Sequence, residues 1–235
     1  MKTKYTLLGA TLSLLGCMGS AQAVINIVEH QTFNDNATPA TYTEVGTPSY
    51  AGGALVLDGS SGLTFTGTSP LTATDNFGIE AIVTLSQLDN FDFILANSVG
   101  VTNAGYGLLQ DTGWQAIVMG QLLSPGDPVV VDTEVRLAYV RDEGFGALYV
   151  NGSFFSALAN APAEPDQLNV GFNPFDFNGT GQGGFNGEIN EIRLFTFTGG
   201  EFVDGDLLQT ATVPEPSSMA LLGLSGLAFA FRRRK

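Results

Sequence analysis

The sequence of 235 residues contains only one cysteine, Cys17, and one histidine, His30. A single cysteine excludes a framework of intramolecular disulfides, and one cysteine with one histidine excludes zinc sites built from these residue types. A Ser-His-Asp triad is excluded unless His30 is its base. These absences remove several common kinds of catalytic or metal centre.

Basic residues are almost absent from the body of the chain. Between Val24 and Val213 there is no lysine, and three arginines (Arg136, Arg141 and Arg193) stand against 22 carboxylates, for a formal charge of −19. Such a body repels phosphate backbones, which excludes nucleic-acid binding through a basic face. Anionic lipid surfaces are equally poor partners. The same charge also keeps an exported protein soluble.

The N-terminal residues 1–23 have the three parts of a secretory signal peptide in order. Lys2 and Lys4 form a positive start, Leu7 to Leu15 an apolar stretch, and Ala21-Gln22-Ala23 a cleavage site of small residues. We expect cleavage by signal peptidase, so that the mature chain begins at Val24. Lipoprotein processing at Cys17 is the alternative.

The C-terminus combines a proline motif, a short apolar run and a basic end. Pro214-Glu215-Pro216 precedes 13 uncharged residues, Met219 to Phe231, and the last four residues are Arg232, Arg233, Arg234 and Lys235. As a helix, the uncharged run spans about 20 Å, less than the roughly 30 Å hydrocarbon core of a bilayer. The basic end should stay in the cytoplasm, with the rest of the protein across the membrane.

This order of parts resembles the PEP-CTERM sorting signal of Gram-negative bacteria. The resemblance covers Val213–Lys235 and implies recognition by an exosortase, a membrane protease and transpeptidase. It further implies processing near Pro-Glu-Pro and delivery to the cell surface or an extracellular polysaccharide matrix. The chain would then touch the membrane only through residues 213–235.

Residues 24–212 have the pattern of one all-β domain. Short runs rich in Val, Ile, Leu, Phe, Tyr and Thr are separated by Gly, Asn, Asp and Pro, and no long segment has helical periodicity. The expected strands are Ala54–Asp58, Leu63–Thr66, Gly78–Leu85, Phe93–Ala96, Tyr106–Leu109, Trp114–Met119, Val135–Arg141, Ala147–Val150 and Glu188–Phe197. Two hairpins in series are expected from Val135 onward, the second turning at Asn151-Gly152. Phe172–Gly187 is expected to be a loop.

Five strings in this region resemble, in order, concanavalin A-like jelly rolls of the laminin-G-like type. They include Ala54–Gly59, Phe77–Val83, Leu148–Gly152 and Phe185–Phe195. The resemblance implies an antiparallel jelly-roll sandwich. Two positions depart from it. Ile82 stands where tryptophan is usual, which should be a substitution in the core, and Asn190 stands where aspartate is usual, which weighs against a metal there.

Glycoside hydrolases of this superfamily carry paired carboxylates on one strand. Here the nearest string is Glu188-Ile189-Asn190-Glu191, whose carboxylates point to opposite faces of a regular strand, whereas retaining chemistry needs both on one side of the sugar. A β-bulge would change that geometry. Glu191 and Arg193 are expected on one face, as an ion pair. The domain is therefore expected to be non-catalytic, with His30 a surface or strand-edge residue.

Calcium is the metal that an exported acidic jelly roll would use, through oxygen ligands in loops. The candidates are Asp58, Asp89 and Asp92. For sugar stacking the candidates are Trp114 and Tyr106, with Tyr139 and the phenylalanines of the 172–177 loop less favoured because most aromatic rings belong to the core.

The sequence thus predicts an exported surface or matrix protein whose jelly-roll domain binds carbohydrate or protein. A purely structural matrix or biofilm protein and a secreted glycoside hydrolase are the alternatives. The expected partners are signal peptidase, an exosortase and extracellular polysaccharide.

Overall fold

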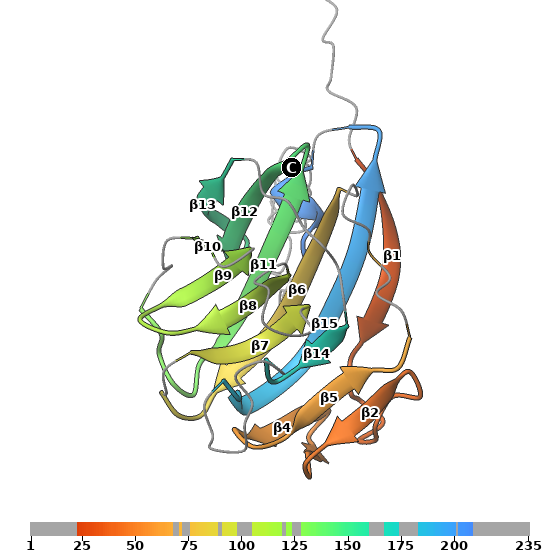
Figure 1. The fold of residues 1–235 in the computed structure, drawn as a ribbon, viewed down its shortest axis with the longest axis vertical. Helices are drawn as coiled ribbons and strands as arrows, with labels where there is room; N and C mark the ends of the chain where they lie inside the picture. Colours follow the sequence, from red (N-terminus) through yellow and green to blue (C-terminus); the bar gives the residue numbers. More distant parts are fainter. Residues whose placement is uncertain are drawn as a thin grey trace, which may run out of the picture.

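The computed structural model describes residues 23–67, 71, 76–88, 91–97, 105–118, 121–123, 128–159, 167–173, 183–200 and 202–208. These residues form two antiparallel β-sheets stacked face to face, as Figure 1 shows. Residues 1–22 of the expected signal peptide 1–23, with Cys17 among them, and the sorting segment 213–235 lie outside the described residues. Within them, no helix has the length and apolar character needed to cross a membrane.

The larger sheet has eight strands. Seven follow the order β13-β12-β11-β6-β15-β4-β3, and β1 pairs with β15 as well. Their bounds are β1 (Val24–Gln31), β3 (Ser49–Ala51), β4 (Ala54–Asp58), β6 (Phe77–Leu85), β11 (Glu134–Asp142), β12 (Phe145–Val150), β13 (Ser153–Leu158) and β15 (Asn186–Thr198).

The smaller sheet has seven strands in the order β10-β9-β8-β7-β14-β5-β2 and crosses in front of the larger one in Figure 1. Their bounds are β2 (Tyr42–Val45), β5 (Gly62–Phe65), β7 (Asp92–Asn97), β8 (Tyr106–Gln110), β9 (Trp114–Val118), β10 (Gln121–Leu122) and β14 (Leu168–Val170). Consecutive strands alternate between sheets often enough to make this a jelly roll rather than two meanders.

The core lies between the two sheets and follows from alternation along each strand. On β6 every second residue from Phe77 to Leu85 belongs to the core cluster. The residues between them, Gly78, Glu80, Ile82 and Thr84, therefore point to the opposite side, which we call the outer face of the larger sheet. β6 is buried on both sides except at Thr84, because other residues cover its outer face as well.

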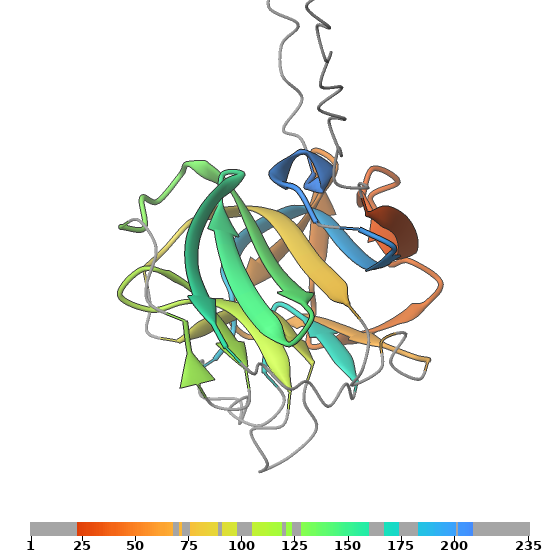
Figure 2. The same ribbon diagram turned by 90° about the horizontal axis from the view of Figure 1, so that it is seen from above.

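The outer face is covered in part by the segment 202–208, which we call the strap. Its single 3₁₀ turn, η1 (Asp204–Asp206), follows Phe202, whose ring stacks on Phe195 with centroids 5.8 Å apart. Phe202 and Leu207 join a second apolar cluster on this face with Tyr149. Figure 2 shows the blue turn on the side of the larger sheet away from the smaller one.

The two hairpins expected from Val135 onward are confirmed as β11-β12-β13. Both turns are two residues long, with φ of 45° and 86° at Glu143 and Gly144 and of 52° and 77° at Asn151 and Gly152. Positive φ at both positions defines the type I′ turn, whose twist matches that of the flanking strands.

All nine expected strands are present, with ends that differ by at most two residues. The sequence did not identify β1, β2, β3, β10 or β14, which are short or lie at the margins of the sheets. In the expected loop 172–187, Phe172 and Gly184 form an isolated antiparallel bridge and β15 already begins at Asn186; residues 174–182, with Phe175 and Phe177, lie outside the described residues.

Candidate ligand-binding site

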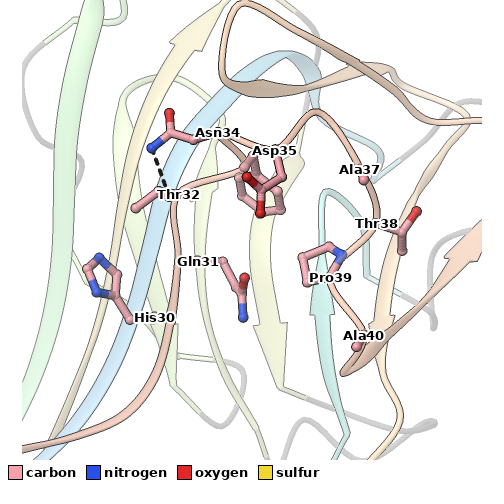
Figure 3. A pocket seen from close by; sticks show the side chains of 10 residues that line it. His30, Gln31, Thr32, Asn34, Asp35, Ala37, Thr38, Pro39 and Ala40 are labelled. Atoms are coloured by element: carbon pink, nitrogen blue, oxygen red, sulfur yellow. Dashed lines mark hydrogen bonds between the residues drawn. The ribbon is translucent and has the colours of Figure 1, made fainter.

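A polar pocket of about 250 Å³ opens where β1 ends and the chain turns toward β2. Ten consecutive or nearly consecutive residues line it: His30, Gln31, Thr32, Phe33, Asn34, Asp35, Ala37, Thr38, Pro39 and Ala40. Figure 3 shows the chain rising past His30 and Gln31 on one side and descending through Ala37 to Ala40 on the other. The pocket is smaller than the roughly 300–1,000 Å³ of drug-sized ligand sites.

The loop that forms this pocket is held in shape from below. Phe33 adopts φ 52° and buries its ring among the core residues, and its carbonyl accepts the backbone N–H of Asn36 at 3.0 Å. Asn36, also at positive φ, accepts the backbone N–H of Gly53 through Oδ1 at 3.2 Å. Asparagine tolerates this conformation better than most residues. The loop is therefore a preformed cup.

Several polar groups on the pocket wall already have partners. Gln31 Nε2 donates to Glu29 Oε1 at 2.6 Å, Asn34 Nδ2 donates to Thr32 Oγ1 at 3.0 Å, and Tyr50 donates to Thr38 at 3.0 Å. These bonds orient the amides without using all of their hydrogen-bonding capacity, since each amide has further donor or acceptor sites.

Asp35 differs from the rest of the wall. Its side chain is exposed and makes no hydrogen bond to any residue that the structure describes, and it lies between the two limbs of the loop in Figure 3. A carboxylate offers acceptor sites to about four donors. Asp35 is therefore the strongest free acceptor for the hydroxyl groups of a ligand.

His30 stands at the margin of the pocket and has a partner that the sequence did not reveal. Its Nε2 lies 2.6 Å from Oε1 of Glu191, on the adjacent strand β15. The expectation that His30 is an exposed residue on an edge strand is confirmed. The expected ion pair between Glu191 and Arg193 is wrong, because Glu191 is engaged by His30 and Arg193 by Glu80.

The string Glu188–Glu191 contains a β-bulge. Glu188 pairs with Thr84 and Glu191 with Ile82, and Asn190 is the extra residue between them. Thr84 and Ile82 are two residues apart and share a face, so both carboxylates point to the outer face. The expectation that they point to opposite faces is wrong because it assumed a regular strand.

Glu80 lies at the centre of the outer face and is completely buried. Its carboxylate pairs with the guanidinium of Arg193, and its Oε1 accepts the backbone N–H of Leu208 at 2.7 Å. Arg193 also donates to the carbonyl of Asp206 at 2.6 Å and lies 4.8 Å from the centroid of the Phe195 ring. Burial raises the pKa of Glu80 while Arg193 opposes the rise. The pair ties the strap to the sheet.

Trp114 and Tyr106 are not ligand-contact residues in this structure. Their side chains are 1% and 2% exposed and belong to the main core. Tyr106 lies among Phe77 and Tyr139, at centroid distances of 4.8 and 6.4 Å. The sequence suggested sugar stacking by these rings, and the correction is that strand alternation turns them inward. Tyr139 is buried for the same reason.

Of the three calcium candidates, the structure describes Asp58 and Asp92. Asp58 Oδ1 accepts hydrogen bonds from the Ser60 backbone at 2.9 Å, the Ser60 hydroxyl at 2.8 Å and the Ser61 hydroxyl at 2.9 Å. These bonds, that of the Ser60 backbone first, lower the pKa of Asp58. Asp58 therefore closes a turn through Oδ1.

Asp92 is buried at the start of β7, in register with Gln110 and thus on the face of Trp114. Asp89 lies outside the described residues. No group of three or more acidic, histidine or cysteine side chains within the described ranges is arranged to hold a metal ion. Calcium binding therefore stays a prediction from the sequence.

One further sequence expectation concerns a single position. Ile82 is buried as expected, but on the outer face of β6 between Arg136 and Glu191 in the register, not in the main core.

The pocket itself was not predicted. Its only sequence signal is the polar run from Gln31 to Thr38, which reads as an ordinary surface loop.

The fold defines the structural class: an antiparallel jelly roll of the concanavalin A-like class. Among solved structures, domain 4 of AbnA, a GH43 extracellular arabinanase from Geobacillus stearothermophilus in complex with arabinotriose, has a TM-score of 0.57 at 18% identity. The match covers 74% of this chain and 95% of that domain. Trypanosoma rangeli sialidase in complex with sialic acid has a TM-score of 0.52 at 14% identity, over 72% of this chain and 30% of the sialidase. These likenesses establish the fold.

The C-terminal residues contain a sorting motif. Residues 212–235 match the PEP-CTERM protein-sorting motif. The chain therefore carries a PEP-CTERM sorting signal, which implies export, membrane-associated sorting and processing by an exosortase, as expected from the sequence. No curated protein matches the chain.

Proposed function

We propose that this protein is a non-catalytic carbohydrate-binding protein of the cell surface or extracellular matrix, and that the 30–40 pocket holds a sugar residue. The observation that carries the proposal is the free Asp35 carboxylate in a preformed polar cup. Sugars present many hydroxyl donors, and hydrogen bonds from such donors to charged acceptors are the stronger kind.

The chemistry of the pocket and of the domain selects the class of glycan. The wall combines the carboxylate of Asp35 with the amides of Gln31 and Asn34, and Glu29 stands beside it. With a domain charge of −19, a polyanionic glycan is repelled. Neutral, hydroxyl-rich sugars therefore fit the site best. Domain 4 of the arabinanase, which shares the fold, is itself bound to arabinotriose, which supports the idea that such a sandwich serves a glycan.

The test is a glycan array probed with the mature protein, with Asp35→Asn as the diagnostic variant. Loss of one charged hydrogen bond should weaken binding and raise the dissociation constant about tenfold, which is equivalent to about 1.4 kcal/mol. Asp132→Asn, which removes an exposed carboxylate outside the pocket, is the matched control and should bind as the wild type does. Equal binding by wild type and Asp35→Asn would remove the pocket from the proposal.

A second candidate is a secreted glycoside hydrolase, which the bulge at Asn190 favours because it places Glu188 and Glu191 on one face. Against it, Glu191 is engaged by His30. Incubation of the protein with neutral polysaccharides, followed by measurement of reducing ends, separates the two. Turnover that disappears in both Glu188→Gln and Glu191→Gln supports the hydrolase; binding without turnover supports the proposal above. If the protein neither binds nor cleaves any of these polysaccharides, the result supports a structural matrix protein.

A further inference from the structure

Two side chains that line the 30–40 pocket donate their hydrogen bonds to carboxylates outside the lining. Gln31 Nε2 donates to Oε1 of Glu29 at 2.6 Å, and the Thr38 hydroxyl donates to Oε1 of Glu44. A hydroxyl has a single hydrogen, so Thr38 can only accept from a ligand. Gln31 keeps its Oε1 as an acceptor and one of its two N–H donors. These two contacts therefore remove donors from the pocket and leave its acceptors.

His30 and Asn34 are engaged in the same way. The Nε2 of His30 lies 2.6 Å from Oε1 of Glu191, and an ionised carboxylate can only accept. The hydrogen between them therefore belongs to His30, and the neutral ring keeps Nδ1 as an acceptor. Asn34 uses one N–H of its Nδ2 on the hydroxyl of Thr32. The lining side chains as a whole thus offer a ligand more acceptors than donors.

The charge around the pocket has one sign. Asp35, which lies between the two limbs of the loop in Figure 3, is the one carboxylate among the ten lining residues. None of the ten is a lysine or an arginine, and the sequence has neither from Val24 to Val135. The domain as a whole has a formal charge of −19. A positively charged group is therefore attracted to the pocket, first by Asp35 and then by the field of the domain.

We propose that the sugar residue held in this pocket is an amino sugar with a free, protonated primary amine. The inference rests on the sugar-binding role proposed above and adds the class of sugar. An ammonium group has three N–H donors and no acceptor, which complements a wall rich in acceptors. Its hydrogen bond to the Asp35 carboxylate is charge-assisted and so belongs to the stronger kind. The other residues of the glycan can be the neutral, hydroxyl-rich sugars described above.

An N-acetylated sugar fits the same pocket less well. Acetylation removes the positive charge, leaves one N–H in place of three, and adds a carbonyl oxygen that needs a donor. The donors that remain on the lining side chains are few, because Gln31, Thr38 and Asn34 already use theirs. The structure therefore favours the free amine over its acetylated form.

Two other kinds of cation match the pocket less closely. Calcium takes about six to eight oxygen ligands, commonly with several carboxylates, whereas Asp35 is the single carboxylate of the lining. A lysine side chain offers the same ammonium group but has no hydroxyl groups for the acceptors of Gln31 and Asn34. An amino sugar supplies both the charge and the hydroxyl donors.

The experiment is an array of sugars printed in matched pairs and probed with the mature protein. Glucosamine, galactosamine and mannosamine are each present as the free amine and as the N-acetylated form. For at least one pair, the wild type should bind the amine at least about tenfold more tightly. Asp35→Asn removes the charge at nearly constant size and should bring this ratio close to one. Asp132→Asn removes a carboxylate outside the pocket and should keep the ratio of the wild type.

The outcomes separate this inference from the sugar-binding role itself. Binding to neutral sugars with no preference for any free amine overturns the inference and leaves the sugar-binding role standing. The absence of binding to any sugar overturns both. A preference that survives in Asp35→Asn shows that the general charge of the domain attracts the amine, and it overturns the inference. So does equal binding of a lysine-containing peptide, or loss of binding in EDTA. Circular dichroism confirms that both variants are folded.

Discussion

Glu80 on β6 and Arg193 on β15 form an ion pair on the outer face of the larger sheet, in which the glutamate has no exposed surface. Through this pair the protein holds residues 206 and 208, only a few residues before the sorting motif. Five residues separate Leu208 from Pro214, which limits their separation to about 20 Å along an extended chain. The sorting signal therefore begins close to the folded domain.

Replacement of Glu80 by Gln should destabilise the domain and release the strap. The variant keeps the shape of the side chain but leaves the half-buried guanidinium of Arg193 without its counter-charge. Breaking a buried pair on one side costs about 3–5 kcal/mol. Urea denaturation measures this loss, and limited proteolysis should show new cleavage at 202–208. Glu188→Gln, on an exposed side chain of the same sheet, should change stability by less than about 0.5 kcal/mol.

Gly78→Ala should disturb the apolar cluster beneath the strap. A Cβ at this position would lie 2.2 Å from the ring of Phe195, which is itself stacked against Phe202. Forcing such a ring aside costs about 1–3 kcal/mol. Gly205→Ala is the control, since nothing lies within 4 Å of its Cβ position. Equal melting temperatures for the two variants would contradict the packing described here.

The domain should lose stability at alkaline pH through its buried tyrosines. Burial, followed by the nearby Asp204 and Asp142, raises the pKa of Tyr149 from 10.0 to about 12, and burial also raises the pKa of Tyr139. A group whose pKa is raised by folding makes its full contribution to the stability of the folded state when the pH is below its unfolded pKa. That contribution is lost as the pH climbs from 10.0 through 12.

Urea denaturation between pH 8 and pH 12 tests this directly. Tyr139→Phe should flatten the alkaline decline. It should cost little at neutral pH, because the Tyr139 hydroxyl is buried without a hydrogen-bond partner among the described residues. A decline of unchanged steepness in this variant would show that other groups cause it.

A double replacement of Pro214 and Pro216 by Ala should leave the fold intact and stop processing. Unprocessed protein should then accumulate in the membrane fraction, as mass spectrometry of the fractions will show. Pro128→Ala, at an exposed position of the domain, should be processed normally. Normal surface delivery of the double variant would overturn the assignment of the sorting signal.

The strands and both β11-β12-β13 turns were predictable because their signals are local. Alternation of apolar and polar residues and the Asn151-Gly152 dipeptide each act within a few residues of the chain. The sorting segment was predictable for the same reason, since its proline motif, apolar run and basic end are read in order. Such local patterns can be interpreted without knowing which residues they contact in the tertiary structure.

The errors arose where a residue's role depends on another strand. Glu191 was matched with its neighbour Arg193, whereas the sheet brings it to His30, 161 positions away, and brings Arg193 to Glu80. The bulge at Asn190, which turns Glu188 and Glu191 to one face, arises from the pairing of β15 with β6. Trp114 was a sugar-binding candidate by residue type, and only its register on β9 places it in the core.

The sequence by itself therefore determined the fold class, the acidic character and the sorting signal, all of which follow from composition and short-range order. The tertiary structure decided which side chains meet: Leu208 of the strap with Glu80, His30 with Glu191, and Trp114 with the main core. Each of these contacts joins segments that are distant in the chain or depends on which face a strand presents. Local propensity does not specify such contacts, because a shift of one residue in register reverses the face.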